Sequence, residues 1–394
     1  MSVTVPTGFR AAGVVAGIKA SGQPDLALVV NDGPSQVAAG VFTANRFKAA
    51  PVLWSSQVLA DARLRAVVLN SGGANACTGP AGFADTHRTA EHVAMALSAP
   101  GVLSNGGSEV GAGEVAVCST GLIGQRLPMD RLLAGVSKAV EALDVDGGLS
   151  AATAIMTTDT VPKVTVYRGP GYCIGGMAKG AGMLAPALAT MLVVITTDAL
   201  VDPADAAHAL RHATAQTFDR IDSDGCMSTN DTVVLMASGA SGVRPSRQEL
   251  QQGLTAACWD LAGQLIADAE GASKQVQIRV EAALTEQDAV EAARAIARSN
   301  LLKCAIHGED PNWGRVLAAL GTVTVSFEPE QVDVAINGVW VCRGGGMGDD
   351  RALVSLAGRE VDITVRLGAG DAAATVLTND LTAAYVHENA AYST

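Results

Sequence analysis

The chain has 394 residues, a length that suggests two or three structural units at roughly 150 residues each. Its formal net charge of −12 argues against a nucleic-acid partner, because phosphate binding needs a concentrated basic surface. Aromatic residues make up only 4% of the chain while glycine occurs 43 times, so we expect a core of small aliphatic side chains.

Predicted strands and helices alternate along the chain. Runs of β-branched and aliphatic residues predict strands at 26–30, 37–43, 66–70, 115–119, 164–167, 191–196, 233–237, 276–280, 323–327, 332–336 and 361–367. Helical spacing of apolar residues predicts helices at 84–97, 129–143, 246–271 and 286–298. The third helix has the clearest signals, since Ser246 and Glu249 form a capping box and Gly271 is expected to end it. Asn337-Gly338 predicts a two-residue hairpin, so the fold class is α/β with some antiparallel pairing.

Residues 180–197 carry no charge and at first resemble a membrane span. Spanning needs roughly 20 consecutive apolar residues, and this run is shorter. Gly180, Gly182 and Pro186 lie in its first half, whereas the part from Met191 to Ile195 is rich in β-branched residues. A Gly-rich loop followed by a buried strand fits this pattern better, and we expect no membrane partner.

Cysteine and histidine usage indicates a reducing compartment and no metal site. The seven cysteines are scattered without a C-x-x-C pair, and residues 1–10 lack the basic segment and apolar core of a signal peptide. The six histidines form no H-E-x-x-H or similar cluster. We therefore expect a cytoplasmic protein with no metal ion and no resident cofactor.

Common catalytic motifs are absent from the sequence. It contains neither the G-x-S-x-G elbow of a serine hydrolase nor a G-x-x-x-x-G-K-[ST] phosphate loop. The glycine runs at 72–73 and 344–346 could cradle an anion, although turns are the commoner use of such runs.

One chemical reading stays open at Lys179, the glycines after it and the step Ala189-Thr190. A threonine hydroxyl becomes a useful nucleophile when a base lies beside it. Its own α-amine, with a pKa of about 8, supplies such a base once the residue is N-terminal. The alternative is an ordinary threonine that enters a β-strand.

Several short segments along the chain carry a resemblance to a known family. They are KGAGMLAPALAT at 179–190, NSGGANACTG at 70–79, STGLIG at 119–124, AIMTTD at 154–159, DPNWGR at 310–315 and ENAAYST at 388–394. Together they resemble the glutamate N-acetyltransferase (ornithine acetyltransferase) family of arginine biosynthesis. The first segment is similar to the self-cleavage segment of that family. Because the matches are spread over essentially the whole chain, the resemblance is specific.

The resemblance implies self-cleavage followed by acyl transfer. Thr190 attacks the carbonyl of Ala189, which divides the chain into an α chain, 1–189, and a β chain, 190–394, with Thr190 at the new N-terminus. Thr190 then accepts acetyl from N2-acetylornithine, ornithine leaves, and glutamate takes the acetyl group to give N-acetylglutamate. The scheme is ping-pong and needs no cofactor. Acetyl-CoA as an additional donor, which would add N-acetylglutamate synthase activity, stays open.

The resemblance also implies which residues act in the site. Thr120 and Gly121 are expected to stabilise the oxyanion of each tetrahedral intermediate, and the alternative is a plain strand-to-loop turn. Substrate binding is expected from Thr157, Lys179, Thr190, Glu270, Asn389 and Thr394. The last two lie in a C-terminal tail that is implied to fold back into the site.

Physical arguments that do not depend on the resemblance also bear on Lys179 and Glu270. A cation near the nucleophile suits a substrate carboxylate, and the alternative for Lys179 is a solvated loop lysine. Glu270 is expected at the end of the capped helix beside Gly271, where the negative end of the helix dipole disfavours a carboxylate. A carboxylate at a position where the helix dipole disfavours it suggests a function, such as binding the ammonium of ornithine. The alternative is that Glu270 is an ordinary surface glutamate.

The implied fold is a layered α/β/β/α sandwich of mixed sheets faced by helices, similar in layering to N-terminal-nucleophile hydrolases. The strand after Thr190 is expected in the middle, and the two chains are implied to form an α2β2 or larger assembly. Two other classes remain open. A self-cleaving aminopeptidase or amidohydrolase of the same fold would hydrolyse amides, and a non-catalytic small-molecule binder would keep the chain intact. The segments 228–231 and 310–313 are expected to support the site or form a turn.

Overall fold

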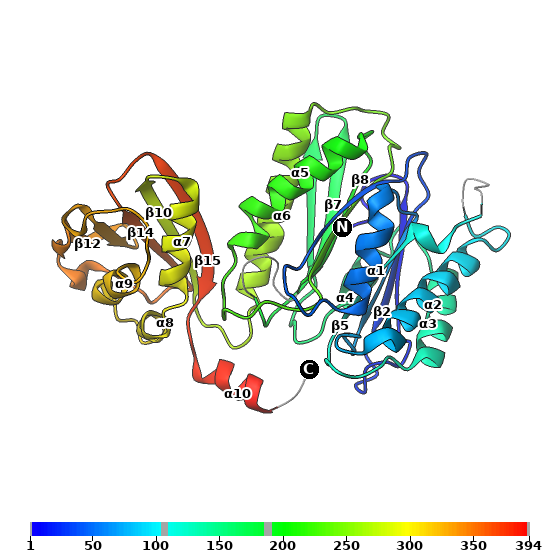
Figure 1. The fold of residues 1–394 in the computed structure, drawn as a ribbon, viewed down its shortest axis with the longest axis horizontal. Helices are drawn as coiled ribbons and strands as arrows, with labels where there is room; N and C mark the ends of the chain where they lie inside the picture. The colour runs from blue at the N-terminus through cyan, green and yellow to red at the C-terminus, as the bar shows by residue number, and fades with distance from the viewer. Residues whose placement is uncertain (1, 104–108, 185–190, 392–394) are drawn as a thin grey trace.

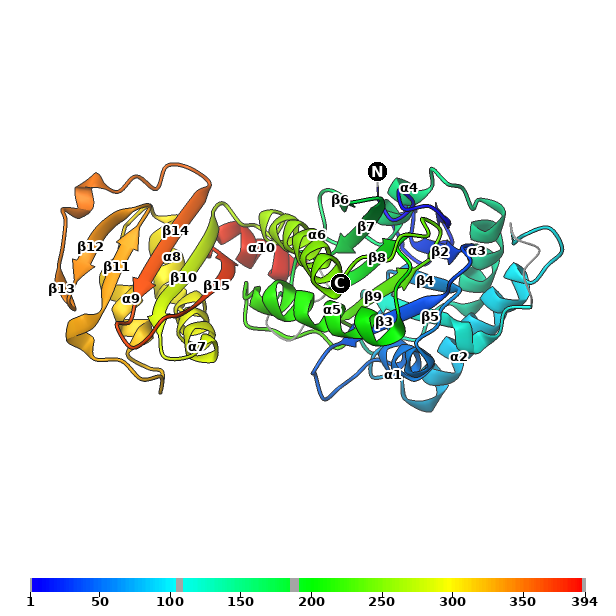
Figure 2. The ribbon, with the colours of Figure 1, turned by 90° about the horizontal axis from the view of Figure 1, so that it is seen from above.

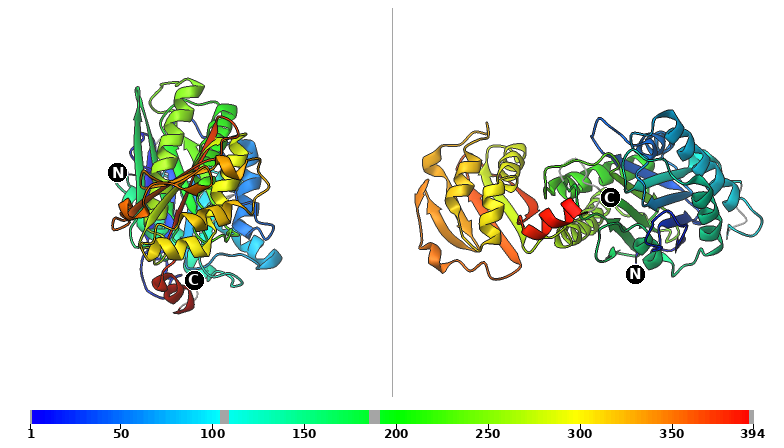
Figure 3. Two further views of the ribbon diagram at one scale, coloured as in Figure 1. Left: turned by 90° about the vertical axis from the view of Figure 1, so that its left-hand side faces the viewer. Right: turned by 90° about the horizontal axis from the view of Figure 1, so that it is seen from below.

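Two facing β-sheets form the larger lobe of the molecule, and a third sheet forms a C-terminal lobe (Figure 1). The computed structural model describes residues 2–103, 109–184 and 191–391. Figure 2 and the right-hand view of Figure 3 show the two lobes side by side, and Figure 1 shows helix α10 (Ala383–Ala391) below the space between them. Among the helices of these described ranges, none is long and apolar enough to cross a membrane.

The first sheet is mixed and carries helices on its outer face. Across the sheet its strands are β1 (Phe9–Val14), β2 (Leu26–Asn31), β4 (Ala66–Ser71) and β5 (Val115–Thr120). Only β4 and β5 run parallel to each other, and the other neighbours are antiparallel. The helices α2 (Gly79–Leu97) and α3 (Met129–Glu141) cover the outer face through side chains such as Val93 and Val136.

The second sheet lies against the first and has β8 at its centre. Across the sheet its strands are β3 (Val37–Phe42), β9 (Thr232–Ala237), β8 (Leu192–Thr197), β7 (Tyr172–Lys179) and β6 (Lys163–Gly169). Helices α5 (Pro203–Gln216) and α6 (Arg247–Ala267) cover its outer face. The predicted capping box of α6 is present, because Ser246 Oγ accepts from Glu249 N at 3.2 Å and Glu249 accepts from Ser246 N at 2.8 Å.

The inner faces of these two sheets form a shared apolar core. Val67 and Cys118 of the first sheet pack with Met177, Val194 and Met236 of the second. Strands buried on both faces read as continuous apolar runs, which is why β2, β4, β5, β8 and β9 were predicted from sequence. Two shorter helices, α1 (Ala50–Val58) and α4 (Gly148–Ala154), pack against β5 and β1 respectively. The α/β/β/α sandwich is therefore confirmed, with β8 in the expected central place.

The C-terminal lobe has its own sheet and its own core. Across the sheet its strands are β13 (Gly346–Met347), β12 (Val339–Arg343), β11 (Asp333–Ile336), β14 (Glu360–Arg366), β10 (Gln275–Ala283) and β15 (Ala372–Asn379). Its helices are α7 (Glu286–Ala297), α8 (Asn300–His307) and α9 (Trp313–Leu320). The predicted hairpin at Asn337-Gly338 is confirmed, since both residues have positive φ, of 46° and 80°, between the paired residues Ile336 and Val339.

Short 3₁₀ turns complete the secondary structure. They are η1 (Leu59–Asp61), η2 (Ala112–Glu114), η3 (Phe218–Arg220), η4 (Pro329–Gln331) and η5 (Arg351–Leu353).

Two element predictions are wrong. The strand expected at 323–327 does not form, and these residues are irregular chain after α9. Their apolar side chains Val323, Val325 and Phe327 pack against the C-terminal core without joining its sheet. Helix α6 ends at Ala267 rather than at Gly271, so Glu270 follows the helix in a turn instead of ending it.

The boundary between the predicted α and β chains crosses the second sheet. Strands β3, β6 and β7 precede residue 189, whereas β8 and β9 follow residue 190. The bond between Ala189 and Thr190 lies outside the described residues, so the division into 1–189 and 190–394 stays a prediction. If that bond is cleaved, the two chains share one sheet and one core.

Candidate active site

A cleft in the larger lobe brings together segments that are far apart in the sequence. It encloses about 590 Å³, part of it open to solvent. Its lining residues are Ala74, Thr120, Gly121, Ile123, Thr157, Thr158, Lys179, Gly182, Met183, Ser228, Thr229, Asn230, Glu270 and Asn389. Among them are all the predicted site residues that the structure describes, namely Thr120, Gly121, Thr157, Lys179, Glu270 and Asn389. Ala189, Thr190 and Thr394 lie outside the described residues.

The strand β5 ends at the cleft in a turn that needs glycine. Gly121 has a φ of +124°, and a Cβ atom there would lie 2.6 Å from Gly73 N and 2.7 Å from Gly72 C. Gly73 N donates to Thr120 O at 2.9 Å, which holds the end of β5 against the loop that follows β4. The sequence Thr120-Gly121 therefore does form the turn that was the alternative reading, and it forms that turn in the wall of the cleft.

Lys179 is a buried side chain at the end of a strand rather than a solvated loop lysine. It is the last residue of β7, its side chain is 2% exposed, and its Nζ donates to Thr120 Oγ1 at 3.4 Å. Burial lowers the pKa of Lys179, and the carboxylate of Asp159, with an oxygen 3.9 Å from Nζ, opposes that effect. The charge of this side chain thus depends on its neighbours.

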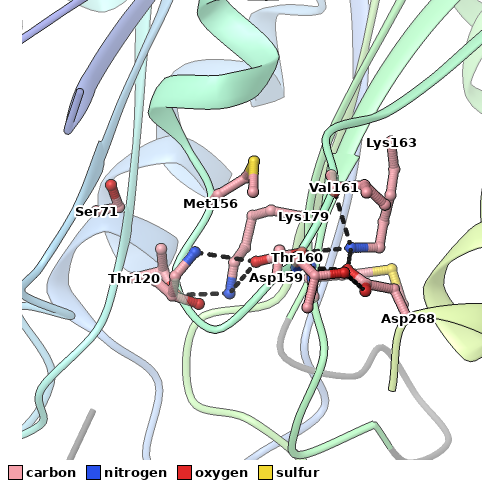
Figure 4. A network of polar contacts seen from close by, with 12 residues as sticks. Ser71, Thr120, Met156, Asp159, Thr160, Val161, Lys163, Lys179 and Asp268 are labelled. Atoms are coloured by element: carbon pink, nitrogen blue, oxygen red, sulfur yellow. Dashed lines mark hydrogen bonds and ion pairs between the residues drawn. The ribbon is translucent and has the colours of Figure 1, made fainter. Parts of the chain in front are cut away.

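Asp159 is a buried carboxylate beside the cleft (Figure 4). Its Oδ1 accepts from Gly180 N at 2.7 Å and from Lys163 Nζ at 2.6 Å, and its Oδ2 accepts from Thr157 N at 2.9 Å. Burial raises the pKa of Asp159, but the charges of Lys179 and Lys163 and the hydrogen bonds from Lys163 and from Thr157 N outweigh burial and lower that pKa to about 2. The group is therefore an anion at neutral pH.

Glu270 reaches the cleft from the turn after α6. Its backbone N donates to Ala181 O at 2.9 Å, and its Oε2 accepts from Asn389 Nδ2 at 3.0 Å. A Cβ atom on Gly182 would lie 2.6 Å from Glu270 Oε2, so glycine leaves room for the carboxylate. The dipole argument for Glu270 fails because α6 ends earlier, but its carboxylate does line the cleft.

The described part of the C-terminal tail, through Ala391, brings Asn389 to the cleft as expected, whereas Thr394 lies outside the described residues. Helix α10 carries Asn389 to Glu270, and it packs so closely on Gly271 that a Cβ atom there would lie 2.3 Å from Tyr385 N. The positive φ of Gly271, +60°, therefore serves this helix contact as well as the turn after α6.

The segment 228–231 supports the site, as expected. Asn230 Nδ2 donates to Ala74 O at 2.6 Å and to Ser119 O at 2.8 Å, which ties together two walls of the cleft. Asp231 Oδ1 accepts from Met191 N at 3.0 Å, and Met191 directly follows Thr190 in the chain. Burial raises the pKa of Asp231 well above its usual value. The segment 310–313, by contrast, forms the turn before α9 in the C-terminal lobe.

Sequence reasoning missed several lining residues. Ala74, Ile123, Thr158 and Met183 each lie inside a segment used for the resemblance, and membership of those segments was the available signal. Across residues 2–103, 109–184 and 191–391, no group of three or more His, Cys, Asp or Glu side chains could hold a metal ion. Of the two glycine runs, 72–73 passes so close to residue 121 that only glycine fits there, and 344–346 lies at the turn between β12 and β13.

A layered α/β/β/α sandwich with a strand-end Thr-Gly turn, a buried lysine and a carboxylate in one cleft has the features of an acyl-transfer enzyme for a small charged substrate. A model of the ArgJ family matches residues 10–394. The arginine biosynthesis bifunctional protein ArgJ of Thermobifida fusca is 63% identical over 394 residues, which covers 100% of both chains. The protein of the same name from Mycobacterium tuberculosis is 59% identical over 394 residues, which covers 99% of this chain and 96% of that one.

A solved structure, described as ornithine acetyltransferase complexed with ornithine from Mycobacterium tuberculosis, is 61% identical to the aligned part. That alignment covers 48% of this chain and 96% of the other, with a TM-score of 0.42. From the family match and the full-length relatives, the chain belongs to the ArgJ family. The resemblance seen in the sequence segments is thereby confirmed.

Proposed function

We propose that this enzyme transfers acetyl from N2-acetylornithine to glutamate through an acetyl ester on Thr190, giving ornithine and N-acetylglutamate in arginine biosynthesis. Membership of the ArgJ family supports the reaction, and its relatives are named arginine biosynthesis proteins. The observation that carries the proposal is the cleft, which gathers Thr120, Gly121, Lys179 and Glu270 in one lining. Asp231 accepts from Met191 N just before β8 begins, and Met191 follows Thr190 in the sequence.

Charge complementarity suggests how the donor binds. N2-acetylornithine carries a side-chain ammonium and a carboxylate, and the cleft offers the Glu270 carboxylate and the Lys179 ammonium. We assign the substrate ammonium to Glu270, with Asn389 holding the carboxylate of Glu270 in place. Lys179 and Thr157 are assigned to the carboxylate end of the substrate.

The oxyanion of each tetrahedral intermediate is assigned to Thr120 and Gly121. The turn that contains them is fixed by the contact with Gly72 and Gly73, so donors placed there need no rearrangement during the reaction. Thr120 Oγ1 also accepts from Lys179 Nζ, which places a positive charge beside the same point. The α-amine of Thr190 is assigned as the base, in line with the family resemblance.

The proposal includes maturation and assembly. We propose that Thr190 cleaves the chain after Ala189 and that the products remain together as an α2β2 or larger particle in the cytoplasm. Because β3, β6 and β7 share a sheet with β8 and β9, separation of the chains would expose an apolar core. Mass spectrometry under denaturing conditions tests the cleavage, and size-exclusion chromatography with light scattering tests the assembly.

Product analysis tests the reaction itself. Incubation with N2-acetylornithine and glutamate should give ornithine and N-acetylglutamate in equal amounts. Release of free acetate instead, with or without glutamate, would indicate a hydrolase of the aminopeptidase class, which family membership does not favour. The relatives are named bifunctional, so acetyl-CoA should be tried as a second donor with glutamate as acceptor.

A further inference from the structure

Lys163 lies at the start of β6 with its side chain wholly buried between two carboxylates. Its Nζ is 2.6 Å from Asp159 Oδ1 and 2.6 Å from Asp268 Oδ2, and it also donates to Val161 O at 3.4 Å (Figure 4). A buried ammonium costs free energy unless it is paired and hydrogen-bonded. Lys163 does not line the cleft, so its pairing needs another explanation than contact with substrate.

Each of the two carboxylates accepts hydrogen bonds from chain that adjoins the lining residues Thr157 and Thr158 of the cleft. Asp159 accepts from Thr157 N and Gly180 N and faces the ammonium of Lys179. Asp268 follows α6 directly and accepts from Thr160 N at 2.9 Å and from the hydroxyl of Thr160. Glu270 comes two residues after Asp268 in the same turn.

We propose that Asp159, Lys163 and Asp268 form a buried charge bridge that positions Lys179 and Glu270 relative to each other and controls the charge of Lys179. These three are positioning residues and do not touch the substrate. The inference rests on the proposed function, because it takes the charged form of Lys179 as the form that binds substrate.

The charges of the bridge act on Lys179 with opposite signs. Asp159 favours the charged ammonium, and Lys163 disfavours it. Burial also lowers the pKa of Lys179, whereas the carboxylates of Asp231 and Glu270 raise it. Among the residues that the structure describes, Lys19 is a further charged group, and it and Lys179 repel each other.

Because Asp159 and Lys163 shift the pKa of Lys179 in opposite directions, replacing each of them should shift the pH profile in opposite directions, which a purely structural role would not do. Activity that needs charged Lys179 falls as pH rises through the pKa of that lysine. Asp159→Asn removes the anion, so the alkaline limb of kcat/KM for N2-acetylornithine should move to lower pH. Lys163→Met removes the cation, so the same limb should move to higher pH. Asp159→Asn should also lower kcat/KM by about tenfold or more at neutral pH, because the Lys179 ammonium loses its fixed position.

The double variant Asp159→Asn with Lys163→Met covers the case in which a single variant fails to fold. It removes Lys163 together with the carboxylate of Asp159 and leaves Asp268, and proteins often tolerate the loss of both members of a buried ion pair better than the loss of one. Asp159 acts on Lys179 more strongly than Lys163 does. The alkaline limb of the double variant should therefore lie at a lower pH than that of the wild type and at a higher pH than that of Asp159→Asn.

Lys274→Met is the matched control. Lys274 is another buried lysine paired with a carboxylate, Glu309 at 2.9 Å, and it is not among the groups that act on Lys179. Its removal should leave the limb in place. Limbs of the two single variants that move in the same direction, or a double variant with the wild-type limb, would overturn the inference. Wild-type protein that transfers no acetyl would overturn the proposed function instead.

Discussion

Replacing Glu270 by glutamine removes one charge from the cleft while keeping the shape of the side chain. Asn389 Nδ2 donates to Glu270 Oε2 at 3.0 Å, and the amide oxygen of glutamine can still accept this bond. A charge-assisted hydrogen bond contributes about 1.5–3 kcal/mol. Because Glu270 is half-buried at a cleft partly open to solvent, we expect the lower half of this range, a loss of about 13- to 45-fold.

Steady-state kinetics can assign this loss to one substrate. In a ping-pong reaction, kcat/KM for N2-acetylornithine reports the first half-reaction and kcat/KM for glutamate reports the second. Glutamate has no side-chain ammonium, so the Glu270→Gln variant should lose kcat/KM for N2-acetylornithine and keep kcat/KM for glutamate. Cleavage between Ala189 and Thr190 should be complete, as seen by mass spectrometry.

Glu388→Gln provides the control for this variant. Glu388 lies on α10 next to Asn389, but it does not line the cleft. It lines a second cavity, together with residues such as Gln264 and Arg359. We expect changes below about twofold, as is usual for surface substitutions. Equal losses for both substrates in Glu270→Gln, or no loss for either, would refute the assignment of the ornithine ammonium to Glu270.

Three further predictions follow from the same site. Initial rates at varied concentrations of both substrates should give parallel double-reciprocal lines, whereas intersecting lines would indicate direct transfer. Gly121→Ala should lower kcat at least about 100-fold, since its Cβ would meet backbone at 2.6 Å and shift the oxyanion donors; near-normal kcat would remove the oxyanion role. The folded-state pKa of Asp159, about 2, lies below its usual value of 3.8, so its contribution of about 2 kcal/mol is fully present above pH 3.8 and is lost as pH falls through about 2. Thermal unfolding of wild type and Asp159→Asn should therefore converge as the pH is lowered over this interval, and a constant gap in stability would contradict that pKa.

The sandwich was predictable because its central strands are buried on both faces. Continuous apolar runs such as those of β2 and β8 leave few alternatives. Strand β7 was missed because it contains Gly175 and Gly176, which weaken a strand signal. Helix α5 was missed although Asp202-Pro203 is a helix-start signal, and its alanine-rich sequence hides the periodicity. The separate C-terminal core could not be inferred, because the chain enters and leaves that lobe without a linker composition.

The candidate site was found through sequence segments rather than through physical patterns. No local sequence feature indicates that Thr120, Lys179 and Glu270 lie together, and the dipole argument for Glu270 depended on a helix expected to run to Gly271, whereas α6 ends at Ala267. The bridge through Lys163 was not foreseen at all. Its partners Asp159 and Asp268 are 109 residues apart in number, and their meeting depends on how α6 packs on β6.

The nature of the nucleophile is tested most directly by mass spectrometry of the denatured protein after incubation with N2-acetylornithine alone. Our account predicts two chains, 1–189 and 190–394, with one acetyl group on Thr190 of the second chain, and removal of that group when glutamate is added. Thr190→Ala should remain one chain of 394 residues without an acetyl adduct and without transfer. A Thr190→Ala protein that transfers acetyl at the wild-type rate would contradict the account, because the nucleophile would then lie elsewhere.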